Sequence, residues 1–162
     1  MKKLKKLTAT AMFAAIIFVL TALVRFPAAS GYIHPGDSMI YICAVVLGSP
    51  WGALAGAAGG ALADVLAGYA VYAPATVIIK AAIAFVFIGA KREKLFSLRN
   101  ALLTVPAGCL TVGGYYLADL IIDKSFALAD ILGNVIQAAG SAVIFIILAL
   151  AFDAAHFFKR KR

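Results

Sequence analysis

Two charged residues stand inside apolar stretches of this chain, where charges are rare. Asp64 lies near the end of one apolar segment, and Lys80 lies within the next, between residues 73 and 90. Burying either charge in a lipid bilayer costs about 3 kcal/mol or more, so such a charge is normally kept for a function. The two residues indicate either a structural ion pair or groups that contact a polar solute, and the sequence leaves both interpretations open.

The composition indicates that these segments lie in a membrane. Of the 162 residues, 64% are hydrophobic and only 14% are charged, and the mean hydropathy is +1.01. A membrane-spanning helix needs about 20 mainly apolar residues. We therefore predict an all-α membrane protein, a bundle of six transmembrane helices in a single domain of residues 1–162. The predicted spans are 7–24, 37–47, 50–67, 73–90, 101–122 and 127–152.

The basic residues gather at three places that flank the predicted spans. Four lie among the first six residues, four lie between the fourth and fifth spans, and four end the chain. With six spans these clusters fall on one side of the membrane, which the positive-inside rule makes cytoplasmic. We expect both termini in the cytoplasm, and we interpret the net charge of +8 as a signal for a lipid bilayer and not for nucleic acid.

In this topology the polar residues of four spans gather beneath the outer face. The third, fourth, fifth and sixth spans each carry polar side chains in the half that lies toward the outside, and almost none in the inner half. Ligand sites combine aromatic walls with a few placed polar groups. We predict a substrate cavity that opens outward and is closed toward the cytoplasm. Its candidate residues are His34, Asp37, Asp64, Tyr69, Tyr72, Thr76, Lys80, Tyr115, Asp119, Asn134, Gln137 and Ser141.

Several of these residues also have a simpler interpretation. Asp119 can be solvated at the membrane surface, and the tyrosines can belong to an interfacial belt of aromatic residues. Asn134 and Gln137 can form hydrogen bonds between helices. His34 can be a solvated loop residue, and Asp37 is placed to cap the second helix. The loop of residues 25–37 lies over the predicted cavity and suggests a lid.

Small residues repeat at a spacing of four in two of the helices. Gly52, Gly56 and Gly60 form a flat ridge on the third span, which lets another helix approach closely. Ala11 and Ala15 stand four apart on the first span, which favours packing inside the bundle or a docking surface for another protein. The two cysteines, Cys43 and Cys109, lie within apolar segments and are interpreted as small packing residues, so we predict no metal and no cofactor.

One long stretch of the sequence resembles a known family. The stretch is GYIHPGDSMIYICAVVLGSPWGALAGAAGGALADVLAGYAVYAPATVIIKA, and its most specific parts are GDS, LGSPWGALAG, ALAD and YAPAT. It resembles the substrate-binding S components of energy-coupling-factor (ECF) vitamin transporters. The six spans, the basic ends and the alanine pair are also similar to that family, so the resemblance covers essentially the whole chain.

The resemblance implies a function in uptake across a bacterial plasma membrane. S components bind a vitamin or its precursor from outside and deliver it by toppling in the membrane. They do so when docked to a module of one transmembrane coupling protein and two cytoplasmic ATPases. The family's small-residue motif on the first helix docks the coupling protein, which here corresponds to Ala11 and Ala15. This chain has no Walker A sequence, so the resemblance implies that it is not an enzyme.

The ligand and two other functions remain open from the sequence. The GDS and YAPAT variants look most like S components for pyridoxine, the hydroxymethylpyrimidine precursor of thiamine, or riboflavin-type ligands. A small heteroaromatic ring would stack on tyrosine, with its hydroxyls held by Asp64, Asn134 and Gln137. The alternative is an autonomous proton-coupled carrier that uses Asp64, Lys80 and Asp119 as a relay. An intramembrane enzyme lacks a matching catalytic arrangement, because His34 and His156 lie on opposite predicted faces.

Overall fold

The structure is a computed structural model that describes residues 3–28 and 32–155. The described part contains six α-helices, two short 3-10 helices and one two-stranded hairpin, so every predicted span corresponds to a helix. The elements are α1 (Lys3–Ala22), β1 (Phe26–Pro27), β2 (Tyr32–Ile33), α2 (Gly36–Val46), α3 (Ser49–Ala67), η1 (Ala70–Tyr72), α4 (Ala73–Phe85), η2 (Val86–Gly89), α5 (Leu98–Ile122) and α6 (Ala129–Ala154).

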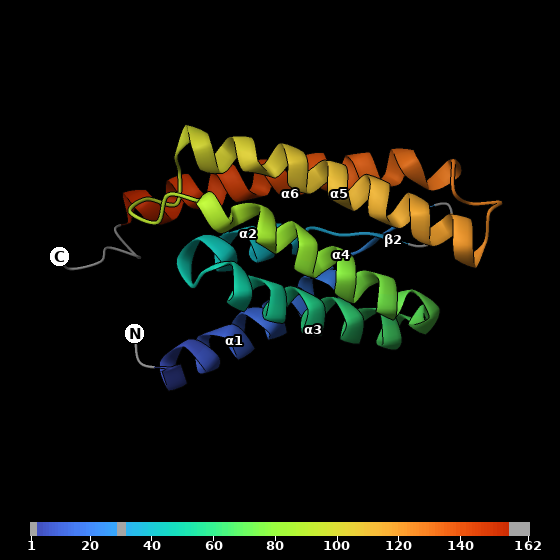
Figure 1. Ribbon diagram of the computed structural model, residues 1–162, viewed down its shortest axis with the longest axis horizontal. Coiled ribbons are helices and arrows are strands. Elements are labelled where there is room, and N and C mark those ends of the chain that lie inside the picture. The colour runs from blue at the N-terminus through green and yellow to red at the C-terminus, as the bar shows by residue number, and fades with distance from the viewer. Residues whose placement is uncertain (1–2, 29–31, 156–162) are drawn as a thin grey trace.

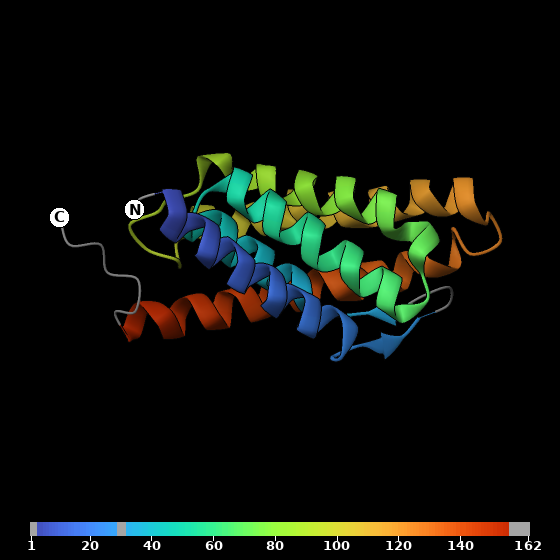
Figure 2. The same ribbon diagram turned by 90° about the horizontal axis from the view of Figure 1, so that it is seen from below.

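The helices run roughly lengthwise in one bundle with two distinct ends (Figure 1). The start of α1, the end of α6 and the loop before α5 lie together at one end, which we call the terminal end. The turn between α3 and α4 and the connection from α5 to α6 lie at the opposite end. The antiparallel pair of β1 and β2 also lies toward that second end (Figure 2), which we call the hairpin end.

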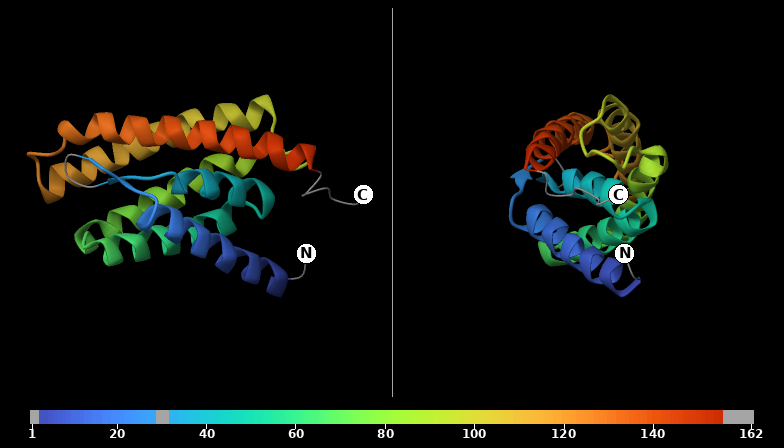
Figure 3. Two further views of the ribbon diagram at one scale, coloured as in Figure 1. Left: turned by 180° about the vertical axis from the view of Figure 1, so that it is seen from behind. Right: turned by 90° about the vertical axis from the view of Figure 1, so that its left-hand side faces the viewer.

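The short helix α2 lies in the interior, with the longer helices around it (Figure 3). It packs against α1, α3, α4 and α6, and nearly all of its residues are buried. Its Tyr41 ring stacks on Phe87, with 5.1 Å between the ring centroids, and meets Phe145 edge-on at 5.9 Å. These apolar rings fill the half of the bundle toward the terminal end. The sealed inner half that the sequence predicts is consistent with this packing.

Glycines let α3 approach its neighbours closely, as the spacing of the ridge predicts. Gly52 and Gly56 face α2, and a methyl group added at Gly60 would lie 2.9 Å from the Thr76 side chain of α4. Gly59 faces α1, where an added methyl group would lie 2.6 Å from the backbone oxygen of Ala14. Larger residues at these crossings would push the helices apart.

The helical fold is that of a membrane protein, and in the described part of the chain four helical segments are long and apolar enough to cross a bilayer. These are α1, the continuous segment Ala70–Gly89, α5 and α6. The helix α2 has only 11 residues and rises about 16 Å, which is shorter than the hydrocarbon core. The helix α3, with 19 residues, is not among these segments. The helical architecture is confirmed, and the count of six membrane crossings stays a prediction.

Candidate functional site

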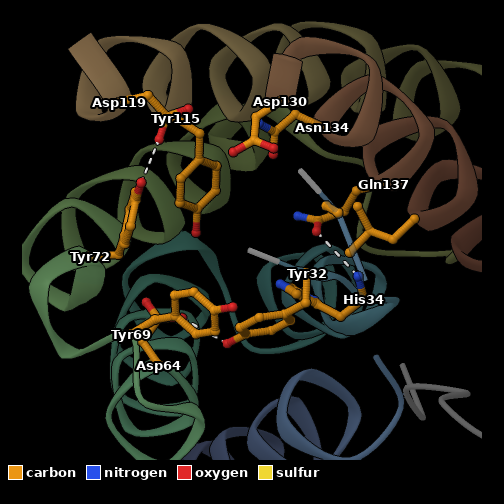
Figure 4. A pocket seen from close by; sticks show the side chains of 12 residues that line it. Tyr32, His34, Asp64, Tyr69, Tyr72, Tyr115, Asp119, Asp130, Asn134 and Gln137 are labelled. Carbon is orange, nitrogen blue, oxygen red and sulfur yellow. Dashed lines mark hydrogen bonds between the residues drawn. The ribbon is translucent and has the colours of Figure 1, made fainter. Parts of the chain in front are cut away.

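A polar pocket lies at the hairpin end of the bundle (Figure 4). Its cavity of about 60 Å³ has room for a few water molecules. Aromatic rings, carboxylates and amides surround it, and they come from the hairpin, the end of α3, the η1 turn, α5 and α6. The lining residues are Ala28, Tyr32, Ile33, His34, Asp64, Tyr69, Tyr72, Tyr115, Asp119, Asp130, Asn134 and Gln137.

The end of α3 brings a row of tyrosines to the pocket. Gly68 ends the helix in a left-handed conformation with φ of 86°, which glycine adopts without strain. The chain then turns through η1, which carries Tyr69 and Tyr72 to the pocket wall. The Tyr69 ring lies 5.5 Å from Tyr32 of the hairpin and 6.4 Å from Tyr72, measured between centroids. The tilted rings form an aromatic wall of the kind on which a flat ligand can pack.

Asp64 joins the hairpin to the helices beneath it. Its carboxylate accepts a hydrogen bond of 2.8 Å from the Tyr32 hydroxyl and another from the Thr76 hydroxyl. The Thr76 oxygen in turn lies 3.1 Å from the Tyr115 hydroxyl of α5. Both carboxylate oxygens of Asp64 are therefore occupied, and the side chain is only 7% exposed.

Within the described residues Lys80 forms a buried ion pair with Asp37, so the interpretation of Lys80 and Asp64 as a structural ion pair is wrong. Lys80 Nζ lies 2.7 Å from Asp37 Oδ1, and the two side chains are 1% and 0% exposed. Gln137 Nε2 donates to the other Asp37 oxygen at 3.2 Å. The reason is the position of α2, which lies in the interior and turns Asp37 toward α4. Asp64 takes its hydrogen bonds from the hairpin and Thr76 instead.

The interpretation of Asp37 as a helix cap is also wrong. No side chain caps the start of α2, which begins at Gly36. Asp37 instead lies in the first turn with its carboxylate directed to Lys80 and Gln137. An ion pair in a low-dielectric interior holds a carboxylate more strongly than exposed backbone amides do. Asp37 is therefore a structural anchor behind the pocket wall.

His34 is buried against the pocket, so the interpretation as a solvated loop residue is wrong. Its side chain is 7% exposed. Its backbone N–H donates to Gln137 Oε1 at 3.2 Å, and its Nδ1 accepts from the Gly36 N–H at 3.1 Å. Burial, with the nearby Lys80 charge, lowers the pKa of His34 to about 3. The ring is therefore neutral at physiological pH, with its proton on Nε2.

Asp119 is also buried, at 1% exposure, so its interpretation as a solvated surface group is wrong. Its Oδ1 accepts a hydrogen bond of 2.8 Å from the Tyr72 hydroxyl (Figure 4). Among the described residues, Asp64, Asp119 and Lys80 each bond to different partners, and no hydrogen bond joins them directly. This arrangement does not favour the relay that the carrier alternative requires.

Comparison with known proteins decides the family. A family model described as "ECF-type riboflavin transporter, S component" matches residues 1–154. The chain belongs to this family. A protein of Pyrococcus woesei, described as "Uncharacterized protein in gap 3'region", is 36% identical over 132 residues, which cover 79% of this chain and 88% of that protein.

Membership confirms the resemblance that the GDS and YAPAT stretches indicate. As an ECF S component, the chain is the substrate-specific subunit of a vitamin transporter, and it works with an ECF module that hydrolyses ATP. The family is one of transporters and not of enzymes. Among the described residues, no three potential metal ligands form a cluster. The pocket of this S component therefore offers aromatic faces, hydrogen bonds and charge.

Most of the predicted substrate-binding residues of the S component do line the pocket. These are His34, Asp64, Tyr69, Tyr72, Tyr115, Asp119, Asn134 and Gln137. Behind them lie Asp37, Thr76 and Lys80, which hold the lining residues, and Ser141, which is buried one turn beyond Gln137. His156 lies outside the described residues.

Sequence reasoning missed four lining residues of the pocket: the polar Tyr32 and Asp130, and the apolar Ala28 and Ile33. A signal for Asp130 was present, because it lies four residues before Asn134 on the same face of α6. The signal for Tyr32 was weaker, because a loop has no periodicity that shows which side chains turn inward. Tyr32 turns inward because its hydroxyl donates to Asp64.

Proposed function

We propose that this S component captures a small heteroaromatic vitamin or precursor from outside the plasma membrane. The ligand class is pyridoxine, hydroxymethylpyrimidine or riboflavin. One observation carries the proposal: a pocket of tyrosines, carboxylates and amides lies at one end of the bundle, while apolar rings fill the other half. A site of this shape binds a solute from one side and does not conduct it.

The distribution of charge supports the orientation. Lys3, Lys5 and Lys6 begin α1 at the terminal end, and the loop from Lys91 to Arg99 lies at the same end. Six crossings would place both chain termini on the cytoplasmic side, as the positive-inside rule requires. The pocket at the hairpin end then faces outward. We propose that residues 1–162 form one domain.

An apolar groove supports the docking part of the proposal. Ala11 and Ala15 are exposed on α1, and together with Leu54, Ala58 and Leu62 of α3 they line the groove. Small residues allow a partner helix to approach the backbone closely. We propose that the transmembrane coupling protein, which carries two ATPases, docks in this groove. The docked subunit then delivers its ligand by toppling in the membrane.

The proposal is tested by identifying the small molecules that co-purify with the protein, using mass spectrometry. We expect a heteroaromatic vitamin or precursor. Asn134→Ala removes a polar group from the pocket wall and is expected to weaken binding about twofold to tenfold, as the loss of one hydrogen bond of about 0.5–1.5 kcal/mol does. Val135→Ala, at the exposed neighbouring position, is the matched control and should bind as the wild type does.

Two results would contradict the proposal. One is the absence of binding by any ligand of the three classes. The other is uptake into vesicles that lack the ATPases, driven by a proton gradient alone, which would favour the autonomous carrier.

A further inference from the structure

Three carboxylates line the pocket, and each comes from a different helix. Asp64 lies on α3, Asp119 on α5 and Asp130 on α6, and none is more than 7% exposed. No lysine or arginine is among the described residues that line the pocket. Figure 4 shows the carboxyl groups around the same space as the tyrosine rings. A buried carboxylate is stable only where hydrogen bonds or a partner of opposite charge compensate its charge.

The cations near the pocket already have other partners. Lys80 is paired with Asp37 behind the wall at 2.7 Å. Arg25 is exposed, and its guanidinium lies over the Tyr32 ring, 5.3 Å from the ring centroid. His34 accepts a backbone hydrogen bond at Nδ1, so its ring is neutral. Among the described residues, no lysine or arginine forms an ion pair with Asp119.

Asp119 has one oxygen that the protein leaves without a donor. Tyr72 donates to Oδ1, but the buried Oδ2 has no hydrogen-bond partner among the described residues. Asp64, by contrast, receives a hydrogen bond at both oxygens. A buried acceptor without a donor costs free energy, so such groups in native proteins usually await a ligand, a water or an ion.

We infer that the ligand of this pocket carries an amino or ammonium group that donates to Asp119, with its aromatic ring packed against the tyrosines. The inference rests on the proposed function and narrows its substrate class. An ammonium group satisfies the open oxygen and compensates the charge of Asp119. An alcohol satisfies the oxygen alone, and an anionic ligand such as a phosphate ester is repelled.

Two pairs of probes test the inference by equilibrium binding to the detergent-purified protein at pH 7. Pyridoxamine and pyridoxine differ only in an aminomethyl group against a hydroxymethyl group. The aminopyrimidine precursor of thiamine and its 4-oxo analogue differ at one ring substituent. We expect the nitrogen member of at least one pair to bind at least about tenfold more tightly than its oxygen counterpart.

Asp119→Asn keeps the shape of the side chain and removes its charge. It should therefore reduce the preference for the nitrogen member over its oxygen counterpart to less than about threefold. Asp123→Asn, at an exposed position just after the same helix, is the matched control and should retain the full preference. The selectivity of the wild type decides the inference even if Asp119→Asn fails to fold.

Equal or tighter binding of the oxygen member in both pairs would overturn the inference and leave the proposed capture function intact. Unchanged selectivity in a folded Asp119→Asn variant would overturn the role of Asp119. If none of the four probes binds, both the inference and the proposed pyridoxine and pyrimidine ligand classes fail.

Discussion

At the scale of single residues, the pair of Lys80 and Asp37 shows how this protein keeps charges in an apolar interior. Each charge compensates the other, and Gln137 and the Tyr115 ring, 5.1 Å from Lys80 Nζ, complete the surroundings. Burying two charges is costly, and removing one partner is worse because the other stays uncompensated. The pair therefore behaves as a unit.

We predict that Lys80→Met and Asp37→Asn each reduce the free energy of unfolding by about 3–5 kcal/mol. The double variant leaves no uncompensated charge and should recover more than half of that loss. Unfolding in detergent, followed for the four proteins of the double-mutant cycle, measures the coupling. Losses that simply add in the double variant would show that the two residues do not act as a pair.

His34 makes the stability of the protein depend on pH. Its pKa is about 3 in the folded protein against 6.5 as the ordinary value, so the unfolded chain binds more protons between these two values. Stability from His34 is fully present above pH 6.5 and is lost as the pH falls toward 3. His34→Asn can keep the acceptor for the Gly36 N–H but cannot titrate. Thermal unfolding midpoints between pH 7 and 4.5 should fall less steeply in this variant, and equal slopes would contradict the assignment.

The sequence predicts the pocket residues better than their bonding. Asp64, Asp119 and Asn134 stand out because polar side chains are rare in membrane segments. Their depth follows from the length of each span. The partner of Lys80 does not follow, because depth says nothing about which helix lies beside which, and only the interior position of α2 brings Asp37 to Lys80.

At the scale of elements, the crossing of α1 and α3 depends on Gly59. Alanine at this position would bring its methyl group within 2.6 Å of the Ala14 oxygen and 3.0 Å of the Ile17 side chain. A backbone oxygen cannot move aside as a side chain end can.

We predict that Gly59→Ala destabilises the protein by about 1–3 kcal/mol through overpacking. Gly140→Ala is the matched control, because it also lies within a helix and an added methyl group meets nothing within 4 Å. That control should be neutral or more stable by up to about 1 kcal/mol. Equal unfolding midpoints for the two variants would show that the crossing tolerates a larger residue.

The helices themselves were predictable, and the hairpin was not. Apolar runs bounded by Gly, Pro and basic residues give helix ends within a few residues of those observed. The strands β1 and β2 have two residues each, too few to show the alternation that marks a strand. They form because the Tyr32 hydroxyl donates to Asp64 and the His34 backbone N–H donates to Gln137, which holds this segment against the helices.

At the scale of the whole molecule, the groove between α1 and α3 lies outside the pocket, and the two share no lining residue. We predict that Ala15→Trp fills the groove and reduces co-purification of the coupling protein and its ATPases at least about tenfold. Ligand binding by the isolated subunit should stay unchanged.

Val143→Trp, on an exposed face of α6, is the control for the bulk of the new side chain and should assemble normally. Full assembly of the Ala15→Trp variant would remove the docking assignment. Weaker ligand binding in that variant would show that the groove and the pocket are coupled through α3.

We expect the attachment of the hairpin to set the rate at which a solute enters the pocket. Tyr32 donates to Asp64 and the His34 backbone donates to Gln137, and each such contact contributes about 0.5–3 kcal/mol net. Breaking both contacts then costs about 1–6 kcal/mol, so the open arrangement is a minor state, populated roughly 0.004–15% of the time. Because the cavity holds only a few waters, a ring enters during those openings. The association rate would level off at high solute concentration, at the rate of opening rather than at the limit set by diffusion.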